Sequence, residues 1–176
     1  MKLIWDKASE VVRIGNVTLE ASPCAYPPFT CEAIVQEQDT HLLLGEQHRL
    51  IEPKEPAWYL ANTLERDEPV YSAGDVVIKP GTPARWLAVI HDIEQQPTTH
   101  NEIIQLAWQN ILRLTTENNI TRLATPALGS VHGKITVTDS LQILFDLLRD
   151  QAPAGLEKIW IIIAENQQLD LVSLLR

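Results

Sequence analysis

The segment ATPALGSVHGKI, residues 124–135, has the residue types and spacing best suited to chemistry in this chain. Gly129, Ser130 and Gly133 are small, so the backbone can approach a ligand closely and point its N–H groups at an anion. A helix predicted to begin near Thr136 would add the N–H groups of its first turn and the positive end of its dipole. The segment therefore suits a phosphate group, but its two glycines also suit an ordinary turn between a strand and a helix.

The histidines form no recognisable catalytic or metal-binding pattern. His132 lies inside the same segment, where it could contact a phosphate, help to position a water molecule, or simply be an exposed loop residue. His91 ends an apolar segment and is expected to fix a neighbouring loop. His41 and His48 are not joined by a carboxylate pattern, so neither a metal site nor a cofactor is predicted.

Length and charge restrict the classes of protein to which the chain can belong. Its 176 residues predict a single domain over residues 1–176. The formal net charge of −9 disfavours binding to nucleic acid or to an anionic membrane surface, but backbone N–H groups can still hold a small anion. The chain starts without the layout of a signal peptide, and no apolar run approaches the ~20 residues of a membrane span. These features predict a cytoplasmic protein.

The second half of the chain alternates strands and helices. Strands are expected at residues 85–93, 121–125 and 158–164, and helices at residues 102–117, 138–149 and from residue 168 onward. Thr99 with Glu102, and Thr136 with Asp139, have capping-box spacing at the starts of the first two helices. This order implies parallel strands joined by crossover helices.

The first half is less regular, with strands expected at residues 11–20, 32–36 and 75–79. Together the two halves predict a three-layer α/β/α domain with a mixed central sheet. Ligands of such sheets bind outside the carboxyl ends of the strands. Residues 124–135 are expected at such an end, which strengthens the phosphate interpretation.

The same segment resembles the second phosphate loop of the macro domain family, which has the form P-x-x-G-T-G-x-G-G after a strand. Pro126, Gly129, Ser130 and Gly133 fit this pattern without a gap. Val131 and Lys134 stand where the family often has glycine.

Three further segments resemble the family in the right order. Residues 72–93 are similar to a G-x-A-v-i-T-p-G segment followed by a strand ending in I-H. Residues 31–39, CEAIVQEQD, resemble the strand D-A-I-V-N-A-A-N, and residues 157–166 resemble the last strand. The resemblance covers most of residues 31–176 and implies a domain that binds ADP-ribose and related nucleotides. Some members of the family also hydrolyse ADP-ribosyl linkages.

The sequence departs from the family mainly on the ligand side. Gln36 and Asp39 correspond to the two asparagines of the family strand, and Asp39 could bond ribose hydroxyls or act as a general base on water. The glycine-rich run that usually follows is replaced by residues 42–53, in which Gly45 is the single glycine. Asn16 is the nearest match to the acidic residue that recognises adenine.

The resemblance therefore implies binding of ADP-ribose or a related nucleotide diphosphate, with hydrolysis of an ADP-ribosyl linkage as a further activity. The expected ligand-binding residues are Gln36, Asp39, Gly45, Pro126, Gly129, Ser130, Val131, His132 and Gly133. Asp39 and His132 are the candidates for catalysis. The alternative is a degenerate module that has lost nucleotide binding and serves as a scaffold for a protein partner.

Overall fold

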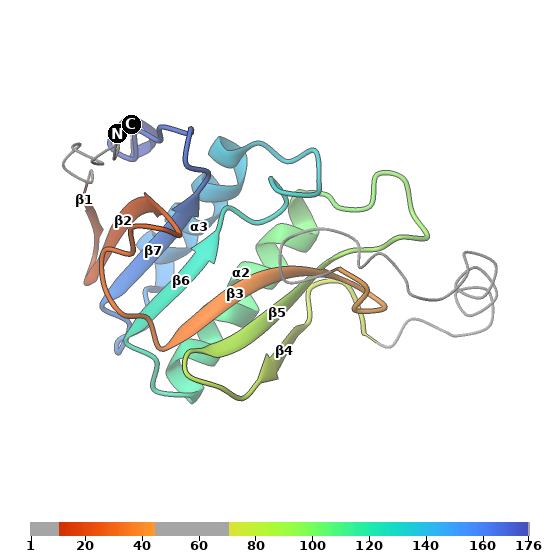
Figure 1. The fold of residues 1–176 in the computed structure, drawn as a ribbon, viewed down its shortest axis with the longest axis horizontal. Coiled ribbons are helices and arrows are strands. Elements are labelled where there is room, and N and C mark those ends of the chain that lie inside the picture. The colour runs from red at the N-terminus through yellow and green to blue at the C-terminus, as the bar shows by residue number, and fades with distance from the viewer. Residues whose placement is uncertain (1–10, 45–70, 176) are drawn as a thin grey trace.

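The computed structural model describes residues 11–44 and 71–175, which form a mixed sheet with helices against it (Figure 1). Seven strands of this part of the chain lie in the order β1-β2-β7-β6-β3-β5-β4. Their bounds are Val11–Ile14 (β1), Val17–Pro23 (β2), Ala33–Asp39 (β3), Val76–Lys79 (β4), Ala84–His91 (β5), Arg122–Pro126 (β6) and Lys158–Ile163 (β7).

The five neighbouring strands from β2 to β5 run parallel, and β1 and β4 pair antiparallel at the two edges. The predicted mixed sheet is therefore confirmed. Parallel strands bring their carboxyl ends to one edge of the sheet. Asp39, His91 and Pro126, the last residues of β3, β5 and β6, consequently lie along the same edge.

Two helices, α2 (Asn101–Glu117) and α3 (Val137–Gln151), pack against each other on one face of the sheet (Figure 1). Both are crossovers between parallel strands that step in the same direction across the sheet, so right-handed connections place them on the same face. No helix in the described part of the chain is long and apolar enough to cross a membrane.

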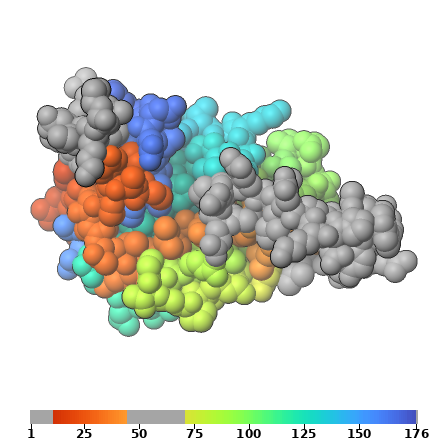
Figure 2. All heavy atoms as spheres, in the orientation of Figure 1, coloured from red at the N-terminus to blue at the C-terminus, as the bar shows by residue number. Residues whose placement is uncertain are grey.

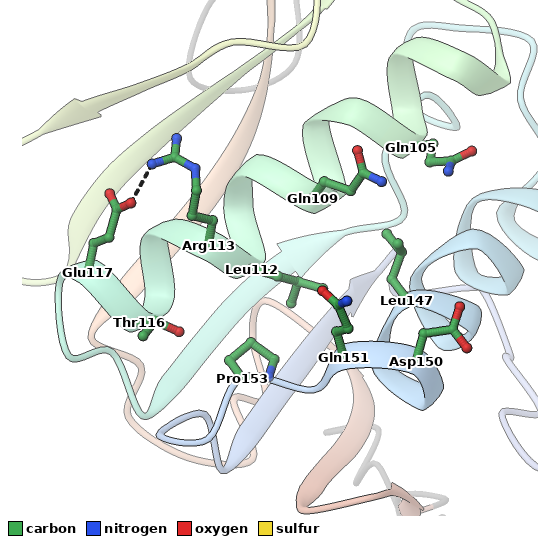
Figure 3. Close-up of a pocket in the computed structure, with 10 residues that line it drawn as sticks. All are labelled: Gln105, Gln109, Leu112, Arg113, Thr116, Glu117, Leu147, Asp150, Gln151 and Pro153. Atoms are coloured by element: carbon green, nitrogen blue, oxygen red, sulfur yellow. Dashed lines mark hydrogen bonds and ion pairs between the residues drawn. The ribbon is translucent and has the colours of Figure 1, made fainter.

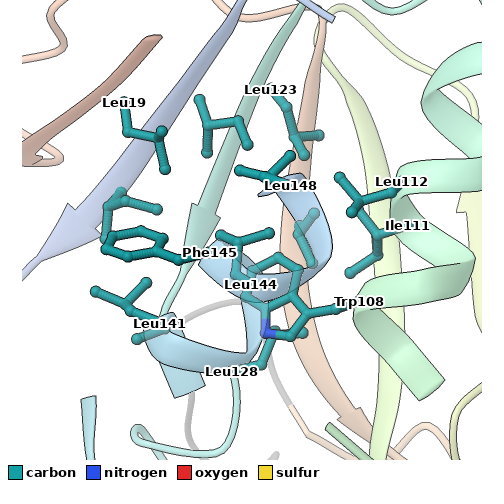
Figure 4. Packing of buried hydrophobic residues seen from close by; sticks show 14 of the residues in the cluster. Leu19, Trp108, Ile111, Leu112, Leu123, Leu128, Leu141, Leu144, Phe145 and Leu148 are labelled. Carbon is teal, nitrogen blue, oxygen red and sulfur yellow. The ribbon is translucent and has the colours of Figure 1, made fainter. Parts of the chain in front are cut away.

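The core lies between these helices and the sheet (Figure 4). Trp108 and Ile111 of α2 meet Leu144 and Phe145 of α3, and all four side chains are fully buried. The buried positions recur every three or four residues, as the amphipathic pattern predicts. Burial of each of these large side chains contributes about 1.5–3 kcal/mol to the stability of the fold.

The helix starts differ in how they are capped. The Thr136 hydroxyl accepts the Asp139 N–H at 3.0 Å, which confirms the predicted cap of α3. The predicted cap of α2 is wrong, because the helix follows His100, and the buried Thr99 hydroxyl has no hydrogen-bond partner among the described residues. Asn119, just beyond α2, has φ 54°, the left-handed conformation expected of an asparagine there.

Thr136→Ala should lower the free energy of unfolding by about 1 kcal/mol, because the Asp139 N–H loses its acceptor. Urea denaturation monitored by circular dichroism measures this change. Thr138→Ala, at an exposed position two residues further on, is the control and should change stability by less than about 0.5 kcal/mol. Equal effects of the two substitutions would contradict a capping role for Thr136.

Two predicted elements are wrong. Residues 11–20 form not one strand but a hairpin of β1 and β2, because Gly15, at φ 59°, reverses the chain. The helix expected from residue 168 onward is reduced to the short 3-10 helix η1 (Ser173–Leu175). The Asp170 side chain accepts the Ser173 N–H at 2.9 Å, and this local turn competes with a longer helix.

A carboxylate joins the amino ends of two central strands. Glu32, just before β3, accepts hydrogen bonds from Thr121 N–H at 2.7 Å and from Arg122 N–H at 3.0 Å. Partial burial acts to raise the pKa of Glu32, but these N–H groups, the Thr121 hydroxyl and the Arg122 guanidinium outweigh it and lower the pKa. Glu32 therefore holds β3 beside β6 most strongly as an anion.

The stability that Glu32 contributes should depend on pH. A pKa lowered by folding gives stability that is present above the unfolded value of about 4.3 and is lost as the pH falls through the folded value. We expect Glu32→Gln to be less stable than the parent at pH 7, and this difference should shrink steadily below about pH 4.3. Denaturant unfolding across this pH range measures the effect, and a difference independent of pH would contradict it.

Candidate functional site

The predicted phosphate loop, residues 126–133, follows β6 at the carboxyl edge of the sheet and is called the glycine loop below. Gly129 has φ 82°, a conformation that side chains rarely adopt. A Cβ atom at Gly133 would lie 2.5 Å from the Gly129 carbonyl oxygen and 2.7 Å from Cγ2 of Thr99. Both glycines are therefore required by the shape of the loop, which folds tightly back on itself.

Several groups of the loop are used to hold this shape. The Ser130 hydroxyl donates to the Ala127 carbonyl at 2.6 Å, and the Ser130 N–H donates to the same oxygen at 3.2 Å. Leu128 is fully buried and anchors the loop to the core, whereas Val131 is 43% exposed at the tip. The serine expected to contact a ligand thus turns its hydroxyl toward its own backbone.

A buried carboxylate on β3 lies beneath the glycine loop. Glu37 has a fully buried side chain. Its Oε1 accepts the Gly129 N–H at 2.7 Å, and its Oε2 accepts the His132 N–H at 3.3 Å. Glu37 therefore binds two N–H groups of the loop that was predicted to bind phosphate.

His91 extends this network to a second loop. Its Nε2 lies 3.1 Å from Oε2 of Glu37, and its Nδ1 lies 3.2 Å from the Thr98 hydroxyl. The rings of His91 and His132 meet nearly at right angles, with centroids 6.0 Å apart. Glu37 and His91 thus connect the glycine loop to the loop between β5 and α2, and the two loops are neighbours on the surface (Figure 2).

Asp39, two residues beyond Glu37, is also fully buried. Its Oδ1 accepts the His41 N–H at 2.7 Å, and its Oδ2 accepts the N–H groups of Leu43 at 2.9 Å and Leu44 at 3.0 Å. The side chain therefore closes the turn that follows β3. Both of its oxygens accept hydrogen bonds from backbone N–H groups.

Comparison with known proteins identifies the fold. No family model and no curated protein matches the sequence. The structure is similar to the Oceanobacillus iheyensis macrodomain with ADP, at 21% identity over 90% of each chain and a TM-score of 0.62. The macrodomain of Thermus aquaticus DarG is 17% identical over 84% of this chain and 99% of its own, with a TM-score of 0.61. The chain has the macrodomain fold.

This result confirms the resemblance on which the fold prediction rested, and with it the three-layer α/β/α class. The macro domain of ganglioside induced differentiation associated protein 2 is also similar, at 14% identity over 86% of this chain and 78% of its own, with a TM-score of 0.55. At these identities the likeness establishes the fold.

The macrodomain fold brings only some of the predicted site residues together. The glycine loop and β3 meet through Glu37. The Gln36 side chain points to the opposite face of β3 and makes no hydrogen bond with the described residues. Gly45 lies outside the described residues. Asn16 donates to the carbonyls of Pro153 and Leu156, both at 3.0 Å, so its amide nitrogen bonds the chain itself.

Glu37 is the residue of the candidate site that sequence reasoning missed. Its signal was a charged residue at an inward position of a strand whose other inward residues, Ala33 and Val35, are apolar. A lone carboxylate in such a place needs buried hydrogen-bond donors. The sequence could not show that the glycine loop, more than 90 residues further on, would supply them.

A groove of about 730 Å³ lies elsewhere on the macrodomain, between α2 and α3 on the helical layer (Figure 3). Gln105 and Gln109 of α2 line it opposite Leu147 and Asp150 of α3. None of its lining residues belongs to the glycine loop, so the groove is separate from the candidate site. Among residues 11–44 and 71–175, no three histidine, cysteine or acidic side chains are arranged to hold a metal ion.

Proposed function

We propose that this chain binds ADP-ribose or a related nucleotide diphosphate, with the phosphates at the glycine loop. The observation that carries this proposal is the set of backbone donors left at the loop. The N–H groups of Val131, Gly133 and Lys134 have no hydrogen-bond partner among the described residues. Helix α3 begins directly after them, and its dipole favours an anion there.

The solved relatives support the same ligand class. One structure of the Oceanobacillus iheyensis macrodomain is described with ADP, and one of its mutants with ADPR. In this chain the glycine loop lies at the carboxyl edge of β3 and β6, where open α/β sheets bind ligands. A nucleotide diphosphate is therefore the ligand class that fits both the fold and the unpaired donors.

Hydrolysis of an ADP-ribosyl linkage is less well supported by the geometry than binding. A general base must reach a water molecule with an available oxygen. Asp39 is fully buried and its two oxygens accept three backbone N–H groups, so a water molecule could reach it only if the turn at residues 41–44 opened. His132 lies in the glycine loop next to exposed Val131 and is the remaining candidate.

The alternative is a macrodomain fold that has lost nucleotide binding and serves as a protein-interaction module. Glu37 favours this alternative, because its carboxylate already binds two N–H groups of the loop. Exposed Val131 favours it too, since a branched side chain stands at the loop tip. The two functions differ in what the loop contacts, so a ligand titration separates them.

Isothermal titration of the purified chain with ADP-ribose tests the proposal. Binding should give a dissociation constant in the micromolar range, which corresponds to about −8 kcal/mol at 1 μM. A thermal shift that rises with ligand concentration should accompany it, because a ligand that binds only the folded state stabilises that state. Neither heat nor thermal shift at low millimolar ADP-ribose would reject nucleotide binding and favour the interaction module.

A further inference from the structure

The Glu37 carboxyl group occupies N–H groups of the glycine loop that could otherwise bind an anionic ligand. Two backbone groups donate to its carboxyl group, the Gly129 N–H and the His132 N–H, and Nε2 of His91 lies 3.1 Å from its Oε2. Backbone N–H groups that donate to both oxygens favour the anionic form of a carboxyl group. The side chain is fully buried, so solvent screens this negative charge poorly.

The contacts of Glu37 include no fixed positive charge. A neutral His91 satisfies them, because Nε2–H can donate to Glu37 while Nδ1 accepts from the Thr98 hydroxyl. No Lys or Arg nitrogen lies within 4.0 Å of Glu37 or Asp39 among the described residues. Lys134, which follows the glycine loop, is exposed. Two buried carboxylates therefore stand at the end of β3 beside the donors left for a ligand.

We propose that Glu37 determines the charge specificity of this site, weakening binding of the doubly charged diphosphate and favouring nucleotide ligands with less negative charge at the loop. This proposal rests on the proposed function, because it assumes that a ligand phosphate uses the N–H groups of Val131, Gly133 and Lys134. His132, which lies between the first two of these residues, donates to Glu37 at 3.3 Å. A phosphate bound there would consequently lie close to the carboxylate, where two negative charges repel.

The test is titration of ADP-ribose into the parent chain, Glu37→Gln and the control Glu32→Gln. Glutamine keeps an oxygen for the Gly129 N–H, and its amide nitrogen can donate to His91 in the other tautomer, whereas the His132 N–H loses its acceptor. Removal of the charge should raise the affinity for ADP-ribose about tenfold. Glu32→Gln removes the same charge at the far end of β3, roughly 17 Å away at 3.3 Å per residue, and should leave the affinity within about twofold of the parent because solvent and salt screen charges at that distance.

The outcomes of this titration distinguish the charge-specificity proposal from the proposed function. Parent binding with Glu37→Gln no tighter overturns the charge-specificity proposal and leaves the proposed function standing. Binding by Glu37→Gln alone supports charge specificity and shows that ADP-ribose is not the ligand of the natural chain. Binding by none of the three chains overturns both proposals. Circular dichroism establishes that each variant is folded.

A second variant keeps the proposal testable if Glu37→Gln fails to fold. Glu37→Ala removes the carboxylate. Acetate is a probe that can supply a carboxylate to the same N–H groups. Acetate should raise the melting temperature of Glu37→Ala more than chloride does at equal ionic strength. It should also weaken ADP-ribose binding to this variant by severalfold relative to chloride. Equal effects of acetate and chloride on both quantities would overturn the proposal.

Discussion

Gly133→Val is expected to reduce the affinity for ADP-ribose by about 100-fold or more while the chain stays folded. A Cβ atom there would lie 2.5 Å from the Gly129 carbonyl oxygen, and this backbone atom cannot yield unless the loop itself moves. Movement would misplace the N–H groups that bind the phosphates, each worth about 1.5–3 kcal/mol to a charged ligand. Isothermal titration measures the loss.

Gly155→Val is the matched control for this prediction. A Cβ atom at Gly155 meets nothing within 4 Å, so the same change in side chain should leave both binding and folding intact. If Gly133→Val bound ADP-ribose as tightly as the parent, the phosphates would have to lie elsewhere and the role of the glycine loop would be refuted.

Asp39→Asn should lower the free energy of unfolding by about 2–4 kcal/mol. The carboxylate accepts three backbone N–H groups, one on Oδ1 and two on Oδ2. An amide in the same place turns its NH₂ group toward at least one of these donors, whichever way it is oriented. Urea denaturation of the variant and the parent measures the difference.

Asp92→Asn provides a comparison, since half-buried Asp92 accepts only the Glu94 N–H among the described residues, at 3.1 Å. Loss of this hydrogen bond should lower the free energy of unfolding by less than about 1 kcal/mol. An Asp39→Asn variant as stable as the parent would contradict the role of Asp39 in closing the turn.

The elements predicted well from sequence are those whose signal is local and repeated. Helix α3 has a capping residue, Thr136, and a regular apolar stripe that includes Leu144 and Phe145. Both signals predict a helix over the same residues. Strand β7 is apolar from Ile159 to Ile163, as expected of a central parallel strand, and four of these five residues are buried. Residues 168–175 lack this agreement, since Asp170 bonds the backbone of Ser173 in a turn and the predicted helix does not form.

The candidate site was predicted less well because its contacts join distant parts of the chain. The glycines could be located from their spacing, and their steric need is visible in the structure. The partner of the loop, Glu37, could not be located in this way, because Glu37 and Gly129 meet only when β3 and β6 pair. Asp39 had the right residue type for a ribose contact, but sequence alone does not show that the turn of residues 41–44 takes both of its oxygens.

The position of β2 also has a consequence for the order in which the chain assembles. β2 lies between β1 and β7, and Thr18 pairs with Lys158, so the first hairpin joins the sheet through the last strand. During synthesis the hairpin therefore lacks its parallel neighbour until residues 158–163 have left the ribosome. Pairing across so long a stretch of sequence closes slowly. We expect docking of the β1–β2 hairpin on β7 to be a late step of folding.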